Sequence, residues 1–286
     1  WSSDVCSSDL KESPNARIMA SFAGAADCHF HIMDAAFPTV PNAVVSNMTA
    51  SVDQYRVFAA ERGTTRGVVV QPSLYGTDNR HTLGAAAALG SGYRAVVVIN
   101  DRLAHDQIFE LHVQGARGAR FNQVQVGSTT MDMMPNVARS IADLGWHLQL
   151  HMKASELARH EAMLSDLPVP LVIDHCGRVE PGDPARTGLD TLLRLLEGGR
   201  TWIKLSAPYL NTRSGAPYYD DAVAIAQLFA DTNEDRVLWG SDWPHVTEAD
   251  NPPAPGPLAE FLVSCLGNDV RLRKALVDNA TALYGF

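Results

Sequence analysis

The sequence contains few cysteines, and none of them stands in a recognisable pair. Four cysteines occur in 286 residues, at Cys6, Cys28, Cys176 and Cys265, and no Cys-x-x-Cys spacing is present. Cysteine zinc modules and redox dithiols use such short spacings, and small secreted folds are dense in disulfides. The sequence therefore argues against both classes, and we expect reduced thiols in a cytoplasmic protein.

The chain also lacks a surplus of positive charge and long apolar runs. It carries 23 Lys and Arg against 32 Asp and Glu, which gives a formal net charge of −9. An acidic chain without a basic cluster is poorly suited to nucleic acid or to an anionic membrane. No apolar stretch approaches the ~18 residues that a membrane-spanning helix needs. We therefore expect no nucleic-acid partner and no membrane partner.

The first 18 residues lack a regular pattern. They show neither an amphipathic period nor the apolar segment of a secretory signal peptide. Met19 directly precedes a segment that is typical of the start of a domain. We expect residues 1–18 to be a non-native or disordered extension, followed by one domain over residues 19–286. Cys6 falls in this extension and is left out of the chemistry.

Short apolar runs alternate with helix-like segments through the rest of the chain. The runs cover residues 25–32, 66–73, 93–100, 115–122, 147–152, 170–177, 201–208 and 236–243. Several are apolar at consecutive positions, as in Val68–Val70 and Val96–Ile99, which is typical of parallel strands buried on both faces. The helix-like segments between them cover residues 52–61, 79–89, 106–114, 136–144, 155–165, 189–196 and 219–231.

Eight such units predict an α/β fold, a single (β/α)8 TIM barrel. A chain of 286 residues suits this fold, which needs roughly 250. An open doubly wound sheet would produce the same alternation. Polar residues cluster at the ends of several runs, however, and barrel enzymes carry their active sites at the C-terminal ends of the strands. This clustering favours the barrel.

Histidines and one aspartate stand at the ends of four of these runs. His29 and His31 are two residues apart on one strand, so both imidazoles face the same side. Such a pair can hold a metal such as zinc, and two hydrogen-bonded histidines are the alternative. His151, His175 and Asp242 end the fifth, sixth and eighth runs and favour an active site. Asp242 suits a base or a metal ligand, although Gly-Ser-Asp could also form a simple turn.

Longer stretches around these residues resemble the amidohydrolase superfamily, specifically its amidohydrolase-2 branch. The Asp-Cys-His-Phe-His of residues 27–31 is similar to the opening motif of the superfamily. The other matching segments are residues 71–73 with 75–79, 118–122, 145–147, 173–178, 204–209, 239–245 and 278–284. The resemblance is nearest to the 2-pyrone-4,6-dicarboxylate and sulfomuconolactone lactonases of that branch, which also includes metal-dependent decarboxylases.

The resemblance implies a role for each candidate residue. The catalytic positions are those of His29, His31, His175 and Asp242. The substrate-binding positions are those of Ser73, Tyr75, Arg120, Asn122, Arg178 and His245. A histidine at position 151, where the pyrone lactonase has a tyrosine, resembles the metal-binding members. The expected ligands of a divalent metal, with zinc first, are therefore His29, His31, His151 and Asp242. A metal-free mechanism on the same histidines stays open.

Two departures from the pyrone lactonase concern substrate charge. That lactonase has an arginine shortly after its Arg-Phe-Asn segment and another after the strand-seven motif. This chain has Gln123–Val126 and Leu210 at those places. Neither Gln nor Leu replaces the rigid guanidinium fork that binds a carboxylate. The departures argue against the pyrone dicarboxylate itself as the substrate.

We therefore expect a hydrolase of aromatic-compound catabolism that opens a small, carboxylated lactone with an activated water. Asp242 would activate the water, and Arg120 and Arg178 would anchor an anionic group. A metal-dependent decarboxylase of a small unsaturated acid is the first alternative, and a non-catalytic binding barrel is the second, because a fold alone does not decide function. The expected partner is a small anionic molecule, and homo-oligomerisation stays open.

Overall fold

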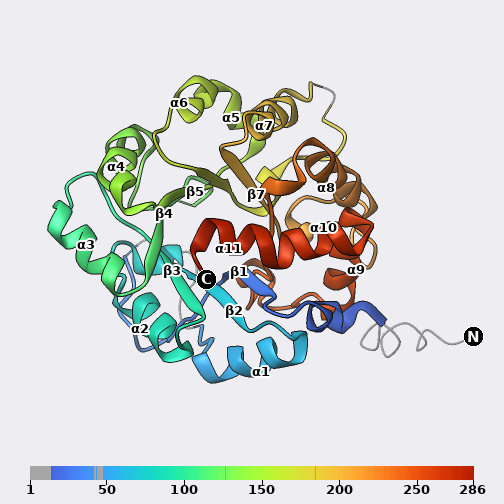
Figure 1. Cartoon of the computed structure of the whole chain (residues 1–286), viewed down its shortest axis with the longest axis horizontal. Coiled ribbons are helices and arrows are strands. Elements are labelled where there is room, and N and C mark those ends of the chain that lie inside the picture. The colour runs from blue at the N-terminus through green and yellow to red at the C-terminus, as the bar shows by residue number, and fades with distance from the viewer. Residues whose placement is uncertain (1–13, 42, 44–47, 126, 184) are drawn as a thin grey trace, which may run out of the picture.

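Eight parallel strands form one sheet in the order β1 to β8, and helices surround it (Figure 1). The computed structural model describes residues 14–286 except 42, 44–47, 126 and 184. The strands are β1 Ala26–Phe30, β2 Arg66–Val70, β3 Tyr93–Val97, β4 Ala116–Asn122, β5 His147–His151, β6 Leu171–Ile173, β7 Thr201–Leu205 and β8 Val237–Trp239. A parallel bridge between Phe30 and Trp243 brings β1 to the β8 end, so the barrel is nearly closed. The predicted barrel is confirmed, and the open sheet is wrong.

Helices follow the strands as the alternation predicts. Those before β8 are α1 Val52–Arg62, α2 Arg80–Leu89, α3 His105–Val113, α4 Met134–Ile141, α5 Ala154–Leu157, α6 Glu161–Ser165, α7 Thr187–Glu197 and α8 Asp220–Thr232. Ser51 and Gln54 form a capping box at the start of α1, and Gly63 ends this helix with a φ of 81°. Three further helices follow β8, at α9 Pro255–Leu266, α10 Asp269–Arg273 and α11 Asn279–Tyr284. The sequence analysis did not predict these last helices.

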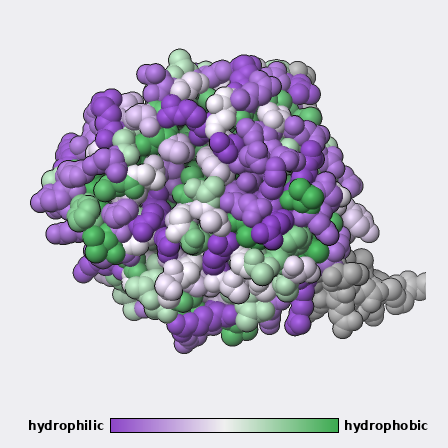
Figure 2. Space-filling view, viewed as in Figure 1, coloured by the Kyte–Doolittle hydropathy of each residue, from purple (hydrophilic) through white to green (hydrophobic). Residues whose placement is uncertain are grey.

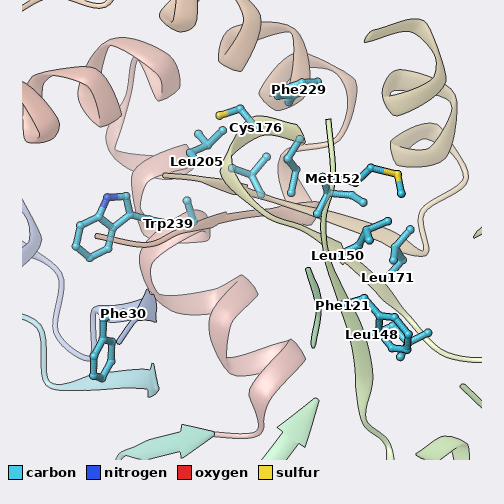
Figure 3. Close-up of a cluster of buried hydrophobic side chains, with 14 of the residues drawn as sticks. Phe30, Phe121, Leu148, Leu150, Met152, Leu171, Cys176, Leu205, Phe229 and Trp239 are labelled. Carbon is cyan, nitrogen blue, oxygen red and sulfur yellow. The ribbon is translucent and has the colours of Figure 1, made fainter. Parts of the chain in front are cut away.

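The strands present alternate side chains to the helices and to the barrel interior. The outward side chains form the larger core. Figure 3 shows Phe121, Leu148 and Leu150 of β4 and β5 in this cluster. A smaller core inside the barrel includes Val70 and Val172. Inward positions of β4, β5 and β7 that lie nearer the strand ends are polar instead, and these positions carry the site.

The C-terminal helices close the barrel at the N-terminal ends of the strands. α11 crosses in front of the strands in Figure 1, and Tyr284 packs against the interior core. Arg66 at the start of β2 donates a hydrogen bond to Thr281 (2.9 Å). Asn279 donates one to the carbonyl of Val237 at the start of β8 (2.8 Å). Figure 2 shows this face, where hydrophilic residues predominate and apolar residues gather in small groups. The opposite end of the barrel is left for the site.

A buried carboxylate holds the seam between β1 and β8. Asp27 accepts hydrogen bonds from the backbone N–H (2.9 Å) and hydroxyl (2.5 Å) of Ser241, which follows β8. It also accepts from the Tyr55 hydroxyl (3.1 Å) and from the N–H of His29 (3.2 Å). Burial raises the pKa of Asp27 to about 6 in spite of these bonds. The four donors tie α1 and both edge strands to one point.

Membrane and thiol expectations can be compared with the described residues. No helix among them has both the length and the apolar character needed to cross a membrane. Cys28, Cys176 and Cys265 are buried and unbridged in the structure. Cys6 lies outside the described residues.

The segment before β1 packs on the barrel earlier than predicted. Residues Pro14–Ser21 form a 3-10 segment, η2, that contacts α9 and α1. Met19 is buried, and Ile18 packs against the main core. The Asn15 amide donates a hydrogen bond to Glu260 of α9 (3.0 Å). Asn15 and Ile18 therefore contact the barrel, and the expected domain boundary at residue 19 stays a prediction. Residues 1–13 lie outside the described residues.

We propose that the domain begins near residue 14, and truncation tests this boundary. Deletion of residues 1–18 removes the Ile18 contacts and the Asn15 hydrogen bond, so the Tm should fall by roughly 2–6 °C, which corresponds to about 1–2 kcal/mol in a chain of this size. Deletion of residues 1–13 is the matched control and should leave the Tm unchanged in scanning calorimetry. Equal Tm values for both truncations and the full chain would contradict the proposal.

Candidate active site

A cleft opens at the C-terminal ends of the strands. Its volume is about 690 Å³, including the space at its open mouth, and its lining comes from the segments that end or follow β1, β2 and β4 to β8. Barrel enzymes place their catalytic groups at this end. The cleft is therefore the candidate active site.

Asp242 lies at the floor of this cleft among three histidines. Its Oδ1 atom is 3.6 Å from Nε2 of His29, 3.7 Å from Nε2 of His175 and 3.9 Å from Nε2 of His31. All four side chains are buried. The distances exceed a hydrogen bond and come near the ~3.4 Å that separates two ligands of a tetrahedral ion bound at about 2.0–2.1 Å. The predicted catalytic residues are thus together in space.

Local backbone features aim these side chains at one another. The register of β1 shifts between Asp27 and Phe30, as in a β-bulge, and both His29 and His31 face Asp242. Phe30 points the other way and stacks on Tyr55 with ring centroids 3.6 Å apart. Asp242 adopts a left-handed φ of 59°, which Asp tolerates better than bulkier residues do.

In two of these histidines, Nδ1, the ring nitrogen that faces away from Asp242, is hydrogen-bonded to an uncharged oxygen. Nδ1 of His31 lies 2.7 Å from the carbonyl of Val70, which can only accept, so Nδ1 carries the proton. Nδ1 of His175 lies 2.8 Å from the hydroxyl of Ser206. Burial lowers the pKa of both histidines, to about 3 for His31. Both rings are therefore neutral near pH 7, and Nε2 of His31 presents a lone pair to Asp242.

The residues on this floor can bind a metal. His29, His175 and Asp242 form a group in which the ligand atoms all lie within 4.8 Å of one another. Nε2 of His29 is buried without a hydrogen-bond partner among the described residues. A carboxylate oxygen and imidazole lone pairs that face one another repel unless a proton or a cation lies between them. Neutral imidazole and carboxylate are also ligands that zinc accepts.

This group differs from the predicted ligand set. His175 belongs to it, although the sequence analysis made it a catalytic residue only. His31 approaches Asp242 but is not part of the group. His151 lies beside it, with its ring centroid 4.9 Å from that of His175. Both ring nitrogens of His151 are buried and lack a partner among the described residues, so its role as a ligand stays a prediction.

A charged cluster that the sequence analysis did not assign lies beneath the histidines. Asp174 Oδ1 is 3.2 Å from Nδ1 of His29 and 3.6 Å from Nζ of Lys204. Asp174 Oδ2 is 3.5 Å from Nε of Arg120. Gln149 accepts from Lys204 (2.7 Å) and donates to Asp174 (3.1 Å). Two cations thus share one buried carboxylate, which leaves one positive charge under the cleft for Asp242 or a bound anion to balance.

The pKa shifts in this cluster follow from burial and from its partners. Burial by itself raises the pKa of Asp174, but the contacts with His29 and Lys204 hold it well below its usual range. Burial lowers the pKa of Lys204. One feature of the sequence could have indicated this buried cluster. Gln149 is a polar residue at an inward position of an apolar strand, two residues before His151.

Tyr209 is a second contact that the sequence analysis missed. Its hydroxyl donates to Oδ2 of Asp242 (2.6 Å) and lies 3.2 Å from Nδ1 of His245. Burial raises the pKa of Asp242 to about 7, in spite of this hydrogen bond. Because Tyr209 occupies Oδ2, the other oxygen of Asp242 is the one that faces the histidines.

The structure divides the predicted substrate-binding residues. Ser73, Arg120 and Asn122 line the cleft. The Asn122 amide donates to the Ser73 hydroxyl (2.7 Å), and Nη1 of Arg120 donates to the carbonyl of Gln71 (3.1 Å). These bonds hold the three side chains in place at one side of the cleft.

The other three predicted substrate-binding residues do not line this cleft. The Tyr75 hydroxyl accepts from the N–H of Asp34 (2.8 Å) and donates to its carbonyl (3.2 Å). Arg178 lines a neighbouring groove with Glu180. His245 is buried and lines a separate cavity beside β7 and β8. Nδ1 of His245 nevertheless lies 3.2 Å from the Tyr209 hydroxyl that binds Asp242, and Arg178 interacts electrostatically with Asp242. The substrate-binding roles of the three residues stay predictions.

Two characterised hydrolases are similar to this chain along most of its length. The chain is 33% identical over 277 residues to a 2-pyrone-4,6-dicarboxylate hydrolase of Comamonas testosteroni, with 92% of this chain and 90% of that protein covered. It is 30% identical over 270 residues to a 4-sulfomuconolactone hydrolase of Hydrogenophaga intermedia, with 92% and 89% covered.

Solved structures share the fold. A probable 2-pyrone-4,6-dicarboxylic acid hydrolase from Acinetobacter baumannii, with citric acid bound, matches with a TM-score of 0.80 at 25% identity, covering 92% of this chain and all of that one. An amidohydrolase from Burkholderia multivorans with bound zinc matches with a TM-score of 0.68 at 18% identity over 92% and 100%. The Amidohydrolase family model matches residues 26–286. The chain therefore belongs to the amidohydrolase family and is a hydrolase with lactonase-like relatives.

Proposed function

We propose that this amidohydrolase opens a small, carboxylated lactone by hydrolysis. The observation that carries the proposal is the Asp242 carboxylate on the floor of a cleft, faced by neutral imidazoles and with Arg120 in the cleft wall. Two relatives are named as hydrolases of such lactones, and the Acinetobacter structure holds citric acid, itself a carboxylate. These relatives support a substrate of the same class.

Asp242 acts as the base in this reaction. Its Oδ1 takes a proton from a water molecule while the water oxygen bonds to the lactone carbonyl carbon. The ring C–O bond then breaks, and the ring oxygen leaves as a hydroxyl with the proton that Asp242 held. One water is consumed, and the new carboxylic acid releases its proton to solvent. Tyr209 keeps Oδ1 turned to the cleft, and Arg120 holds the substrate carboxylate.

A divalent metal fits the same floor. His29, His175 and Asp242 would hold it, and zinc is the ion we expect, as in the Burkholderia structure. When bound, such an ion supplies Lewis-acid polarisation of the carbonyl and makes water easier to deprotonate. Asp174 would support it by accepting from Nδ1 of His29, which turns the Nε2 lone pair toward the group.

Acid release tests the reaction itself. Wild-type protein should release one proton per ring opened when small carboxylated lactones are titrated in a pH-stat. Asp242→Asn should lower kcat at least about 1000-fold, because amide nitrogen and oxygen cannot accept the proton from water. Asp53→Asn on the exposed surface of α1 is the matched control and should retain activity. Release of CO2 from an unsaturated acid, without ring opening of any lactone, would show a decarboxylase instead.

Metal content distinguishes the two ligand sets. Purified protein should contain about one zinc per chain, and a chelator should abolish activity that added zinc restores. His175→Asn should lose the metal, because His175 belongs to the buried group, whereas His151→Phe should retain it. Elemental analysis measures both. Loss of metal from His151→Phe with retention in His175→Asn would favour the ligand set predicted from sequence. Active protein without metal would show that Asp242 acts as the base without a metal ion.

Arginine replacement tests the anion site. Arg120→Met should raise KM for a carboxylated lactone about 30-fold or more, since loss of a desolvated charge pair costs on the order of 2–5 kcal/mol. Arg56→Met on the exposed face of α1 is the matched control and should leave KM unchanged. Steady-state kinetics measures both. An unchanged KM in Arg120→Met would remove this residue from the substrate site.

A further inference from the structure

The side chains that line the cleft differ in polarity from one side of the barrel to the other. Most of the side chains from the segments at β2, β4 and β5 are polar, namely those of Ser73, Arg120, Asn122, Gln125 and His151, whereas Pro72 and Leu74 are apolar. A small recess beside Arg120 adds the hydroxyl residues Ser128 and Thr129. Because the strands are ordered β1 to β8 around the barrel, these residues occupy one arc of the rim. We call this the polar arc.

The opposite arc is apolar. Leu210 follows β7 and Val246 follows β8, and both are half-buried residues that line the cleft, with Thr247 next to Val246. Val246 and Leu74 pack on one apolar cluster around Met33, so this arc continues to the rim beside β2. We call Leu210 and Val246 the apolar arc. The histidines and Asp242 lie on the floor between the two arcs.

The charges around the cleft suit one substrate anion. Among the described residues that line the cleft, Arg120 is the one Arg or Lys. The buried cluster beneath has two cations, Arg120 and Lys204, for the single carboxylate of Asp174. Nη1 and Nε of Arg120 face Gln71 and Asp174, and Nη2 has no acceptor among the described residues. One guanidinium edge is therefore available, on the polar arc.

We propose that the cleft selects a lactone with one carboxylate and one uncharged, apolar substituent. The carboxylate lies at Arg120 and the recess beside it. The substituent lies against Leu210 and Val246, where it is removed from water. A second carboxylate against the apolar side chains of this arc would lose part of its hydration to Leu210 and Val246, which cannot hydrogen-bond it, and this disfavours binding. This inference rests on the proposed lactone hydrolysis and adds the substrate class.

A pair of isosteric substrates tests the selection. Two γ-lactones carry the same ring carboxylate and differ at one other ring position, which bears either a 3-methylbutyl or a 2-carboxyethyl group. Wild-type kcat/KM should favour the 3-methylbutyl lactone by about 100-fold or more. Equal rates, or a preference for the diacid, would overturn the proposal.

Replacement of Leu210 tests where the selection arises. Leu210→Arg places a guanidinium on the apolar arc and should shift the ratio of kcat/KM toward the diacid by at least about tenfold. Leu210→Met keeps the arc apolar and should keep the wild-type preference. Thermal denaturation of both variants shows whether they fold. A folded Leu210→Arg variant with an unchanged ratio would show that Leu210 does not face the substituent.

A binding measurement separates this proposal from the proposed reaction. The isosteric ligands 6-methylheptanoate and adipate carry one and two carboxylates, and calorimetry with the wild-type protein should give the first at least about tenfold tighter binding. Arg120→Met should weaken both. If neither lactone is hydrolysed but this preference holds, the reaction is wrong and the selection stands. If both lactones are hydrolysed but adipate binds as tightly, the selection is wrong and the reaction stands.

Discussion

The hydrogen bonds of Asp27 are the constraint on which both the fold and the site depend. A parallel barrel must join its first and last strands, and here one buried carboxylate receives four donors from β1, α1 and the segment after β8. Bonds of this kind to a charged group contribute about 1.5–3 kcal/mol each. Just above, the Asp242 N–H donates to the His29 carbonyl (2.8 Å). The seam therefore places the base and the first histidine opposite each other.

Closure of the barrel creates a second requirement, because it buries charge. Asp174, Lys204 and Arg120 point into an interior from which water is largely removed, and each must find a partner there. The shared carboxylate of Asp174 satisfies Lys204, supports His29 and leaves Arg120 with a free edge at the cleft. The cluster that pairs the buried charges thus also orients His29 on the floor of the site and sets the charge beneath the cleft.

The sequence predicted most of the fold and about half of the site. Runs apolar at consecutive positions, such as Val96–Ile99, indicated parallel strands because such strands are buried on both faces. His29, His31, His175 and Asp242 were predicted together because strand ends meet at one rim. Tyr75, Arg178 and His245 also follow strands, but they lie in loops. Spacing along the chain does not indicate which way a loop side chain turns, so the substrate-binding roles of these three stay predictions.

The sequence by itself determined the barrel, the family resemblance and the residue types at the strand ends, because hydrophobic period and motif spacing are local properties. Tertiary structure decided which atoms meet. It brought Tyr209 to Asp242 and Asp174 to His29 through contacts between separate strands, and it packed Ile18 against the core. It also placed Leu210 opposite Arg120 across the cleft. These pairings depend on barrel closure, which joins positions far apart in the chain.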